Sequence, residues 1–232
     1  MLVVSQGRTE AVKIWTKIGQ LVGSIENSHD GFCQCDLNKR TIAIPAGSNE
    51  IQLCTIRETL EIMTEQFLRV DTKKGSIMAL KLVDRSLISA YESGAICKWD
   101  LILPNKIENE YQIDCMPTCI AVNIERQEIL LGTSSEKLYI FDERMVIKRE
   151  IVLTNAGLNS IALRPDGKVY ATGGWDRRIR VFSAKSHKKL CVLQLHDGSL
   201  NCVTFTVGQP SGLLVAASSD ALISLWNIYS SV

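Results

Sequence analysis

The residues of this sequence whose types could do chemistry are three histidines, eight cysteines and one run of basic side chains. A nucleophilic or acid–base site needs a base such as histidine within hydrogen-bond reach of the group it activates. His29 and His187 fall in connecting segments, and we expect His196 to support the fold. The sequence therefore predicts no catalytic residue.

The eight cysteines do not follow the spacing of a metal centre, because no C-x-x-C pair occurs. Two closely spaced pairs lack the spacing or the neighbouring histidines of a zinc site: Cys33/Cys35 and Cys115/Cys119. Most cysteines lie in apolar runs, as Cys97 does, so we expect reduced, buried thiols that behave as small hydrophobic side chains. We predict no metal site, no cofactor-binding residue and no cofactor.

One basic run has the composition of a phosphate-binding patch. It consists of Arg177, Arg178, Arg180, Lys185, His187, Lys188 and Lys189. We expect Arg177 and Arg178 to lie in one turn and the lysines in the next, at opposite ends of a strand. Solvated turns are therefore the favoured interpretation, with Arg177 and Arg178 as candidate contacts for a partner. Asp176, beside them, is expected to be a turn carboxylate that accepts from backbone N–H groups.

The overall charge argues against a polyanion as partner. The chain has 232 residues with 26 Lys+Arg against 25 Asp+Glu, a net charge of +1, whereas nucleic-acid-binding domains usually show a basic surplus. No apolar run approaches the roughly 18 residues of a membrane span, and the N-terminus lacks the features of a signal peptide. We expect an intracellular protein that binds neither nucleic acid nor a membrane.

A strand–turn–strand unit recurs along the whole chain. Each unit is a short apolar strand, a turn of small or polar residues, and a second strand that ends in an aromatic residue or, once, in a cysteine. The units are Leu2–Trp15, Ile42–Cys54, Leu87–Trp99, Ile129–Phe141, Val169–Phe182 and Leu213–Trp226. Their last residues recur every 39–45 residues, a period typical of β-propeller blades. We predict one all-β propeller domain over residues 1–232, with third strands ending near residues 15, 54, 99, 141, 182 and 226.

The last unit resembles the WD-repeat family, because its strand ends in Trp226-Asn227, close to the Trp-Asp pair of that repeat. In the family, a histidine, a serine or threonine on the second strand, an aspartate and the tryptophan form a hydrogen-bonded support. His196, Asp220 and Trp226 match this pattern, but Ala216 stands in place of the hydroxyl residue. The resemblance therefore implies a blade support that lacks one member.

The other units match the same pattern in part. In the preceding unit Thr172 and Asp176 match, Phe182 replaces the tryptophan and no histidine enters the blade. Trp15 and Trp99 occupy the tryptophan position of their own units. We therefore expect an incomplete polar network throughout and blades that depend more on packing.

Longer segments are similar to one branch of the WD-repeat family; they are Val4–Arg8, Asp30–Cys33, Ala171–Phe182 and Ile223–Tyr229. That branch has seven blades and is associated with the machinery that matures large phosphatidylinositol-3-kinase-like kinases, and its fungal members belong to the ASTRA chromatin-associated assembly. The resemblance implies an incomplete ring of about six of the seven blades, which opens on the second strand of a blade. We interpret the chain as N-terminally truncated.

The function implied is a non-enzymatic protein-interaction scaffold. It would be an adaptor for the assembly or maintenance of those kinases in DNA damage signalling, with co-chaperone partners, or part of an ASTRA-type complex, in cytoplasm and nucleus. One alternative is a G-protein-beta-like signalling scaffold, although no gamma subunit is expected because the N-terminal helix that pairs with it is missing. The other is a propeller hydrolase, against which the apolar innermost strands count.

Overall fold

The computed structural model describes residues 2–103, 106–207 and 212–228. Within this part of the chain the secondary structure consists of β-strands and one short 3-10 helix, η1 (Thr72–Lys74). The chain divides into two compact units, Met1–Asp114 and Cys115–Val232, which are described separately. None of the described residues belongs to a helix that is long and apolar enough to cross a membrane.

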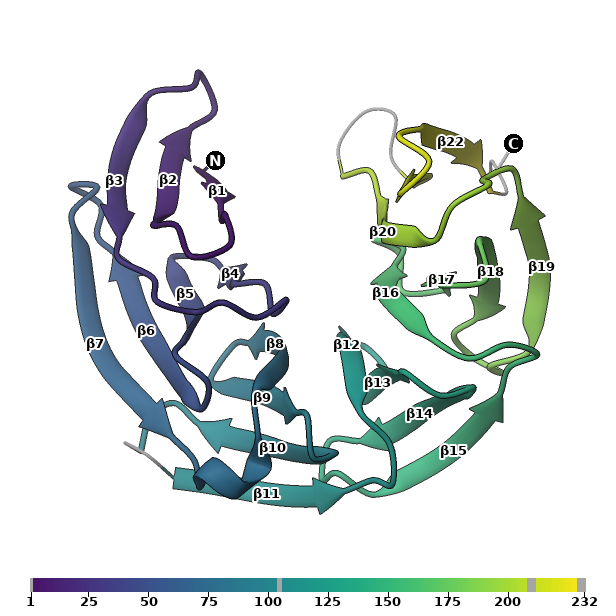
Figure 1. The fold of residues 1–232 in the computed structure, drawn as a ribbon, viewed down its shortest axis with the longest axis horizontal. Coiled ribbons are helices and arrows are strands. Elements are labelled where there is room, and N and C mark those ends of the chain that lie inside the picture. The colour runs from purple at the N-terminus through teal and green to yellow at the C-terminus, as the bar shows by residue number, and fades with distance from the viewer. Residues whose placement is uncertain (1, 104–105, 208–211, 229–232) are drawn as a thin grey trace. The chain divides into compact units, whose positions relative to one another are not determined.

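Unit 1 contains three antiparallel sheets (Figure 1). The first consists of β1 (Leu2–Ser5), β2 (Val12–Thr16) and β3 (Leu21–Ile25). The second consists of β4 (Asp36–Asn38), β5 (Thr41–Ala46), β6 (Glu50–Ile56) and β7 (Ile62–Arg69). The third consists of β8 (Ile77–Val83), β9 (Ser86–Tyr91), β10 (Ala95–Asp100) and β11 (Lys106–Gln112). In each sheet, strands that are consecutive in the sequence pair with one another.

Unit 2 repeats this arrangement with three more antiparallel sheets. The first consists of β12 (Pro117–Asn123), β13 (Glu128–Thr133), β14 (Lys137–Asp142) and β15 (Ile147–Val152). The second consists of β16 (Leu158–Leu163), β17 (Val169–Gly174), β18 (Arg178–Ser183) and β19 (Lys189–Gln194). The third consists of β20 (Leu200–Phe205), β21 (Leu213–Ser218) and β22 (Ile223–Asn227).

The position of a strand within its sheet determines its hydrophobic pattern. Every residue of β13 and of β17 is buried, since these strands have neighbours on both faces. By contrast β11 alternates between exposed and half-buried residues, as a strand with one face in solvent does. The sequence follows the same rule, because apolar runs mark the middle strands and charged residues alternate along β11.

The hydrophobic core lies between successive sheets. In unit 1 one cluster joins the first sheet to the second and another joins the second to the third. In unit 2 the three first strands, β12, β16 and β20, lie beside one another, whereas β15 and β19 lie on the outside (Figure 1). Apolar clusters again fill the space between neighbouring sheets. Stacked four-stranded antiparallel sheets are the blades of a propeller, so the expected fold class is confirmed.

The six anchor residues of the sequence pattern lie in equivalent strands. Trp15, Cys54, Trp99, Phe141, Phe182 and Trp226 lie in β2, β6, β10, β14, β18 and β22, one residue before the strand end except for Cys54. Because β2 carries an anchor, β1 and β2 correspond to the second and third strands of a blade, as expected.

The anchor side chains differ in burial. The Trp226 side chain is only half-buried against its cluster, whereas Trp99 is 1% exposed. The extent of a single domain over residues 1–232 stays a prediction.

Candidate functional site

The most extensive match to the expected blade support lies in the third sheet of unit 2. His196 lies in the loop after β19, and Asp220 lies in the turn between β21 and β22. The two ring nitrogens of His196 contact different partners: Nδ1 is 2.9 Å from Asp220 Oδ2, and Nε2 is 2.8 Å from Ser224 Oγ. The indole N–H of Trp226 donates to the same Ser224 hydroxyl at 2.8 Å.

These contacts determine where the protons lie. The Asp220 carboxylate only accepts, so His196 Nδ1 carries a proton and donates to it. The Ser224 oxygen accepts from the indole, and its own hydrogen is then directed to His196 Nε2, which accepts. The result is one directed chain from Trp226 through Ser224 and His196 to Asp220, and chains of this kind strengthen their members.

The sequence-based expectation of a missing hydroxyl is wrong for this blade. Ser224 lies directly across from Ala216 in the β21–β22 pair, so it presents a hydroxyl at the neighbouring cross-strand position. A search limited to the second strand misses it. The signal was a serine two residues before the anchor tryptophan, on the same face of the strand.

Asp220 is held in its ionised form by several donors. Burial opposes ionisation, but the backbone N–H groups of Leu222 and Asp197 and the His196 ring donate to the carboxylate. Together with Ser218 these contacts lower the pKa of Asp220 to about 2. The carboxylate therefore fastens the loop after β19 to the β21–β22 turn.

In the preceding blade, an arginine occupies the cross-strand position that Ser224 has in the last blade, and it binds the turn aspartate. Thr172 and Asp176 lie where the family pattern places them, but Arg180 lies across from Thr172 and is 2% exposed. Its guanidinium binds both oxygens of Asp176, at 3.0 and 2.5 Å, and donates to Thr154 at 3.1 Å. The Thr172 hydroxyl is buried and has no partner among the described residues. Asp176 is thus an ion-pair partner of Arg180 as well as the expected turn acceptor of a backbone N–H, that of Arg178 at 3.4 Å.

Two blades of unit 1 also use a serine beneath the anchor tryptophan. Trp99 donates to Ser89 in β9 at 2.8 Å, and Ser89 donates to the hydroxyl of Tyr91 at 2.9 Å. Here a buried tyrosine fills the role that histidine has in the family pattern, and burial raises the pKa of Tyr91. Trp15 likewise donates to Ser5 at 2.8 Å. The polar network that supports the anchor tryptophans is therefore more complete than the sequence suggested.

A charged cluster that the sequence analysis missed joins two blades of unit 2. The Glu128 side chain is 2% exposed and accepts from Lys148 at 2.6 Å and from Arg126 at 3.2 Å. His187, from the β18–β19 turn of the next sheet, lies 3.4 Å away and also contacts the Tyr170 hydroxyl. Burial would raise the pKa of Glu128, but Lys148, His187 and Arg126 keep it below its usual value. Burial lowers the pKa of His187.

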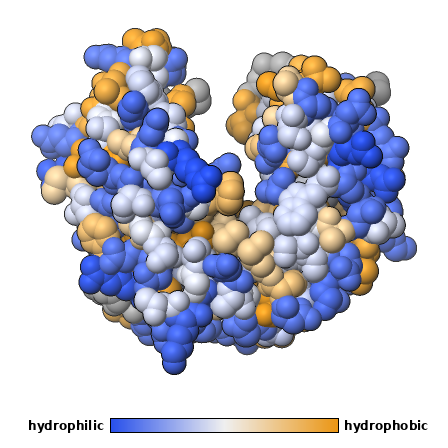
Figure 2. Space-filling model, in the orientation of Figure 1, coloured by the Kyte–Doolittle hydropathy of each residue, from blue (hydrophilic) through white to orange (hydrophobic). Residues whose placement is uncertain are grey.

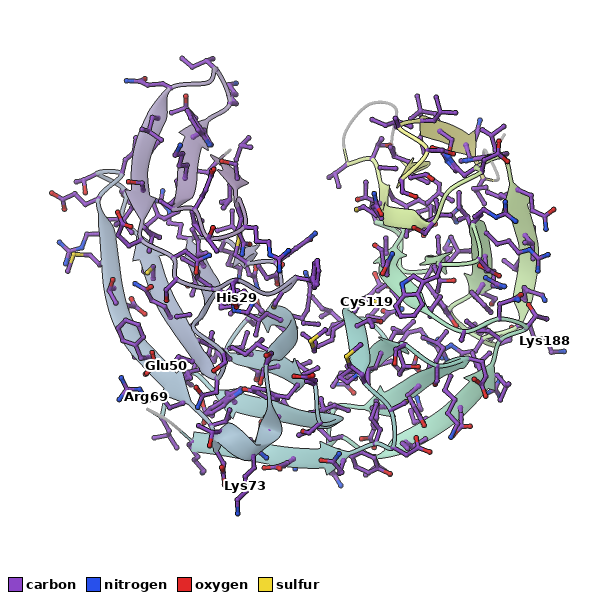
Figure 3. All side chains as sticks on the ribbon, viewed as in Figure 1. His29, Glu50, Arg69, Lys73, Cys119 and Lys188 are labelled. Carbon is purple, nitrogen blue, oxygen red and sulfur yellow. The ribbon has the colours of Figure 1, made fainter. Side chains whose placement is uncertain are left out.

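Neither the other histidine, His29, nor the cysteines form part of a metal-binding cluster in the part of the chain that the structure describes. His29 is buried in unit 1, with Nδ1 2.6 Å from the Gly47 carbonyl (Figure 3). Within the described residues no three His, Cys, Asp or Glu side chains gather to hold a metal ion. The cysteines are free, as expected, but burial is less general than expected: four of the eight are buried, three are half-buried and Cys202 is exposed.

The basic run divides as expected. Arg177 lies in the β17–β18 turn, and Arg178 is the first residue of β18. Lys185 and Lys188 lie in the β18–β19 turn at the opposite end of the sheet, with Lys188 at the outer edge of unit 2 in Figure 3. Arg177 is exposed and has a left-handed φ of 68°. Arg178 donates to Asn155 at 3.3 Å.

Ser224, His196 and Asp220 together have the composition of a catalytic triad, and their geometry decides against that use. A nucleophilic serine needs an accessible oxygen and donors that stabilise an oxyanion. Ser224 is 6% exposed, and its oxygen already accepts from Trp226. The arrangement supports a blade and offers no approach to a substrate.

Comparison with known proteins identifies this architecture. A family model described as "WD domain, G-beta repeat" matches residues 149–183 and 187–227. These two segments of the chain are similar to WD repeats. The two matched segments end at the β18 and β22 strands, so they include Asp176 and Arg180 in one repeat and the His196–Trp226 chain of hydrogen bonds in the other.

Among curated relatives, the chain is similar to guanine nucleotide-binding protein subunit beta-like protein 1 of Mus musculus. The two are 28% identical over 253 residues, which span 98% of this chain and 74% of the mouse protein. ASTRA-associated protein 1 of Schizosaccharomyces japonicus is 29% identical over 68% of this chain, and the match spans about half of that relative (48%). The Schizosaccharomyces pombe protein of the same name is 40% identical over 32% of this chain and 20% of its own length.

A solved structure supports the fold alone. The computationally designed Ika8 protein matches with a TM-score of 0.74 at 15% identity, over 98% of this chain and 68% of that protein. At this identity the likeness extends to the arrangement of strands and not to any function.

Proposed function

We propose that the complete protein is a non-enzymatic scaffold that holds other proteins together. The observation that carries this proposal is the use of Ser224, His196 and Asp220, which are consumed in a buried support for Trp226. Side chains of the kind that could do chemistry therefore serve the blades, and the exposed turns are left for contacts with partners. Binding residues lie disproportionately on loops that a rigid scaffold positions.

The finer proposal concerns the partners. We propose an adaptor role in the assembly or maintenance of phosphatidylinositol-3-kinase-like kinases together with co-chaperone machinery, or in an ASTRA-type complex, in cytoplasm and nucleus. Its support is the similarity to proteins named ASTRA-associated protein 1 and the length of the match to the mouse relative. The fold by itself does not support it, since propellers host many functions.

The experiment is depletion of the complete protein from cells, followed by measurement of the steady-state levels of those kinases. Affinity purification of the complete protein identifies its partners in parallel. We expect kinase levels to fall and kinase or co-chaperone subunits to co-purify. Unchanged kinase levels with no such subunit in the purified material would refute the adaptor role.

A second candidate is a G-protein-beta-like signalling scaffold, which the description of the matching family and the name of the mouse relative favour. The same purification distinguishes the two roles, because a signalling scaffold of that kind would co-purify with a gamma subunit or an alpha subunit. We expect neither to be enriched.

A further inference from the structure

One pocket of unit 2 is lined in part by side chains that take no part in the blade support. It has a volume of about 320 Å³ and is lined by Asp176, Arg177, Arg178, Gln194, Leu195, His196 and Asp197. These residues come from the β17–β18 turn with the start of β18, and from the end of β19 with the loop that follows it. Both segments are fixed at their bases, one by Arg180 and the other by Asp220.

An exposed tryptophan stands next to this pocket in the β17–β18 turn. Trp175 is 43% exposed, yet its indole N–H donates to Asn159 Oδ1 at 2.5 Å and its backbone N–H donates to the Gly157 carbonyl at 2.9 Å. The ring lies so close to Gly157 that a Cβ there would come within 2.1 Å of it. An aromatic side chain held rigidly in solvent loses little entropy on binding, which is the property of an anchor residue.

Once Asp176 is paired with Arg180, the lining of the pocket carries more guanidinium groups than carboxylates. Asp176 is neutralised by the two contacts of Arg180. Asp220 stays ionised, but it contacts His196 and the backbone of Asp197 and does not belong to the lining. Asp197 is the remaining carboxylate of the lining, against the two guanidinium groups of Arg177 and Arg178. The side chain of Arg177 forms no hydrogen bond or ion pair with the described residues.

We propose that this pocket binds an extended acidic segment of a partner protein. A carboxylate of the segment pairs with Arg177 and Arg178, and a neighbouring apolar side chain packs on Trp175. The exposed Leu195, at the other side of the lining, covers a second apolar side chain. Arginine suits this role because its planar fork binds a carboxylate through two parallel hydrogen bonds. The proposal rests on the scaffold function above and specifies the chemistry of one partner.

The test begins with a selection that assumes no ligand. Random peptides displayed on phage are selected on the full chain and counter-selected on the full chain that carries Trp175→Ala, Arg177→Glu and Arg178→Glu together. We expect the surviving peptides to share an Asp or Glu close to an aromatic or aliphatic residue. Survivors without an acidic residue, or no survivor that distinguishes the two proteins, would overturn the proposal.

The selected peptide is then synthesised with a fluorescent label, and its affinity is measured by anisotropy. Trp175→Ala and Arg177→Glu should each weaken binding about tenfold or more, as loss of a binding hot spot does. Replacement of the acidic residue of the peptide by its amide should have a similar effect. Arg144→Glu is the matched control, since Arg144 is exposed in the β14–β15 turn at the other end of its sheet, and it should leave the affinity unchanged. Equal loss in the control would contradict a specific pocket.

Thermal melts show whether each variant is folded, so that lost binding cannot come from unfolding. Affinity purification of the complete protein with and without the triple change separates the two proposals. Partners that are retained despite the triple change would refute the pocket and leave the scaffold function intact. If no partner is purified with either form, the scaffold function itself fails.

Discussion

Ser224 joins His196 to Trp226 from the third strand of its blade, directly across from Ala216. Its hydroxyl satisfies an indole donor and an imidazole acceptor, and the imidazole is buried in the blade. The position of the hydroxyl on the second or the third strand makes little difference to the support, provided that both partners are within reach. The same cross-strand position carries Arg180 in the preceding blade, where it binds Asp176.

Removal of the Ser224 hydroxyl tests this support. Ser224→Ala leaves the buried His196 Nε2 acceptor and the indole donor of the half-buried Trp226 without their partner, which we expect to cost about 1–3 kcal/mol of unfolding free energy. Denaturant unfolding measures the change. The double change Ser224→Ala with Ala216→Ser returns a hydroxyl to the opposite strand and should recover part of the loss. A cost below about half a kcal/mol for Ser224→Ala, the range of an ordinary surface change, would show that the hydrogen-bond chain contributes nothing.

The pH dependence of Asp220 provides a second test at this scale. Its pKa in the folded chain is about 2, below the value of about 3.9 for an unfolded aspartate. Stability that comes from the ionised carboxylate is therefore fully present above about pH 4 and is lost as the pH falls toward 2. Urea unfolding of the wild type and of Asp220→Asn should differ at pH 6, and the difference should shrink below pH 4. A difference that stays constant down to pH 3 would exclude this linkage.

At the scale of elements, the burial of each third-strand anchor follows from the sheets that cover it. Trp99 is 1% exposed between two layers of side chains, whereas Trp226 is half-buried. Figure 2 shows apolar surface at the end of unit 2 where Figure 1 draws β20 and β22. Leu222, Ile223 and Leu225 are exposed there.

The loss of stability when an anchor is truncated to alanine should depend on how deeply that anchor is buried. Trp99→Ala removes a fully buried indole and should cost about 3–5 kcal/mol, because burial is lost and a cavity forms. Trp226→Ala should cost less, and Arg178→Ala should change stability by no more than about half a kcal/mol as a surface substitution. Thermal melts of the three variants rank them. Equal melting temperatures for Trp99→Ala and Arg178→Ala would contradict the packing account.

The Glu128 cluster links two neighbouring blades of unit 2 through Lys148 and His187. Glu128→Gln removes the charge that three basic side chains share, and we expect a loss of about 1–3 kcal/mol. The matched control is Glu136→Gln, an exposed position in the β13–β14 turn, which should have little effect. Denaturant unfolding of the two variants compares them. If both lose the same stability, Glu128 has no special role between the blades.

At the scale of the whole molecule, the repeat in the sequence predicted the all-β fold, since the spacing of the anchors and the alternation of apolar residues are local signals. It also brought His196, Asp220 and Trp226 together correctly. It missed Ser224, Glu128 and Trp175, whose roles depend on which residues meet across strands and between sheets. Such pairings are set by register and by the neighbouring blade, which a single repeat does not contain.

The central claim is that the buried Ser224, His196 and Asp220 support a blade of a scaffold and do not form a hydrolase site. The most direct test is exposure of the folded chain to a fluorophosphonate, which reacts with the activated serine of serine hydrolases, followed by intact-mass analysis and peptide mapping. Because the Ser224 oxygen is shielded and accepts from Trp226, we expect no adduct on Ser224 in the folded chain. Stoichiometric labelling of Ser224 that disappears with His196→Ala would contradict the account.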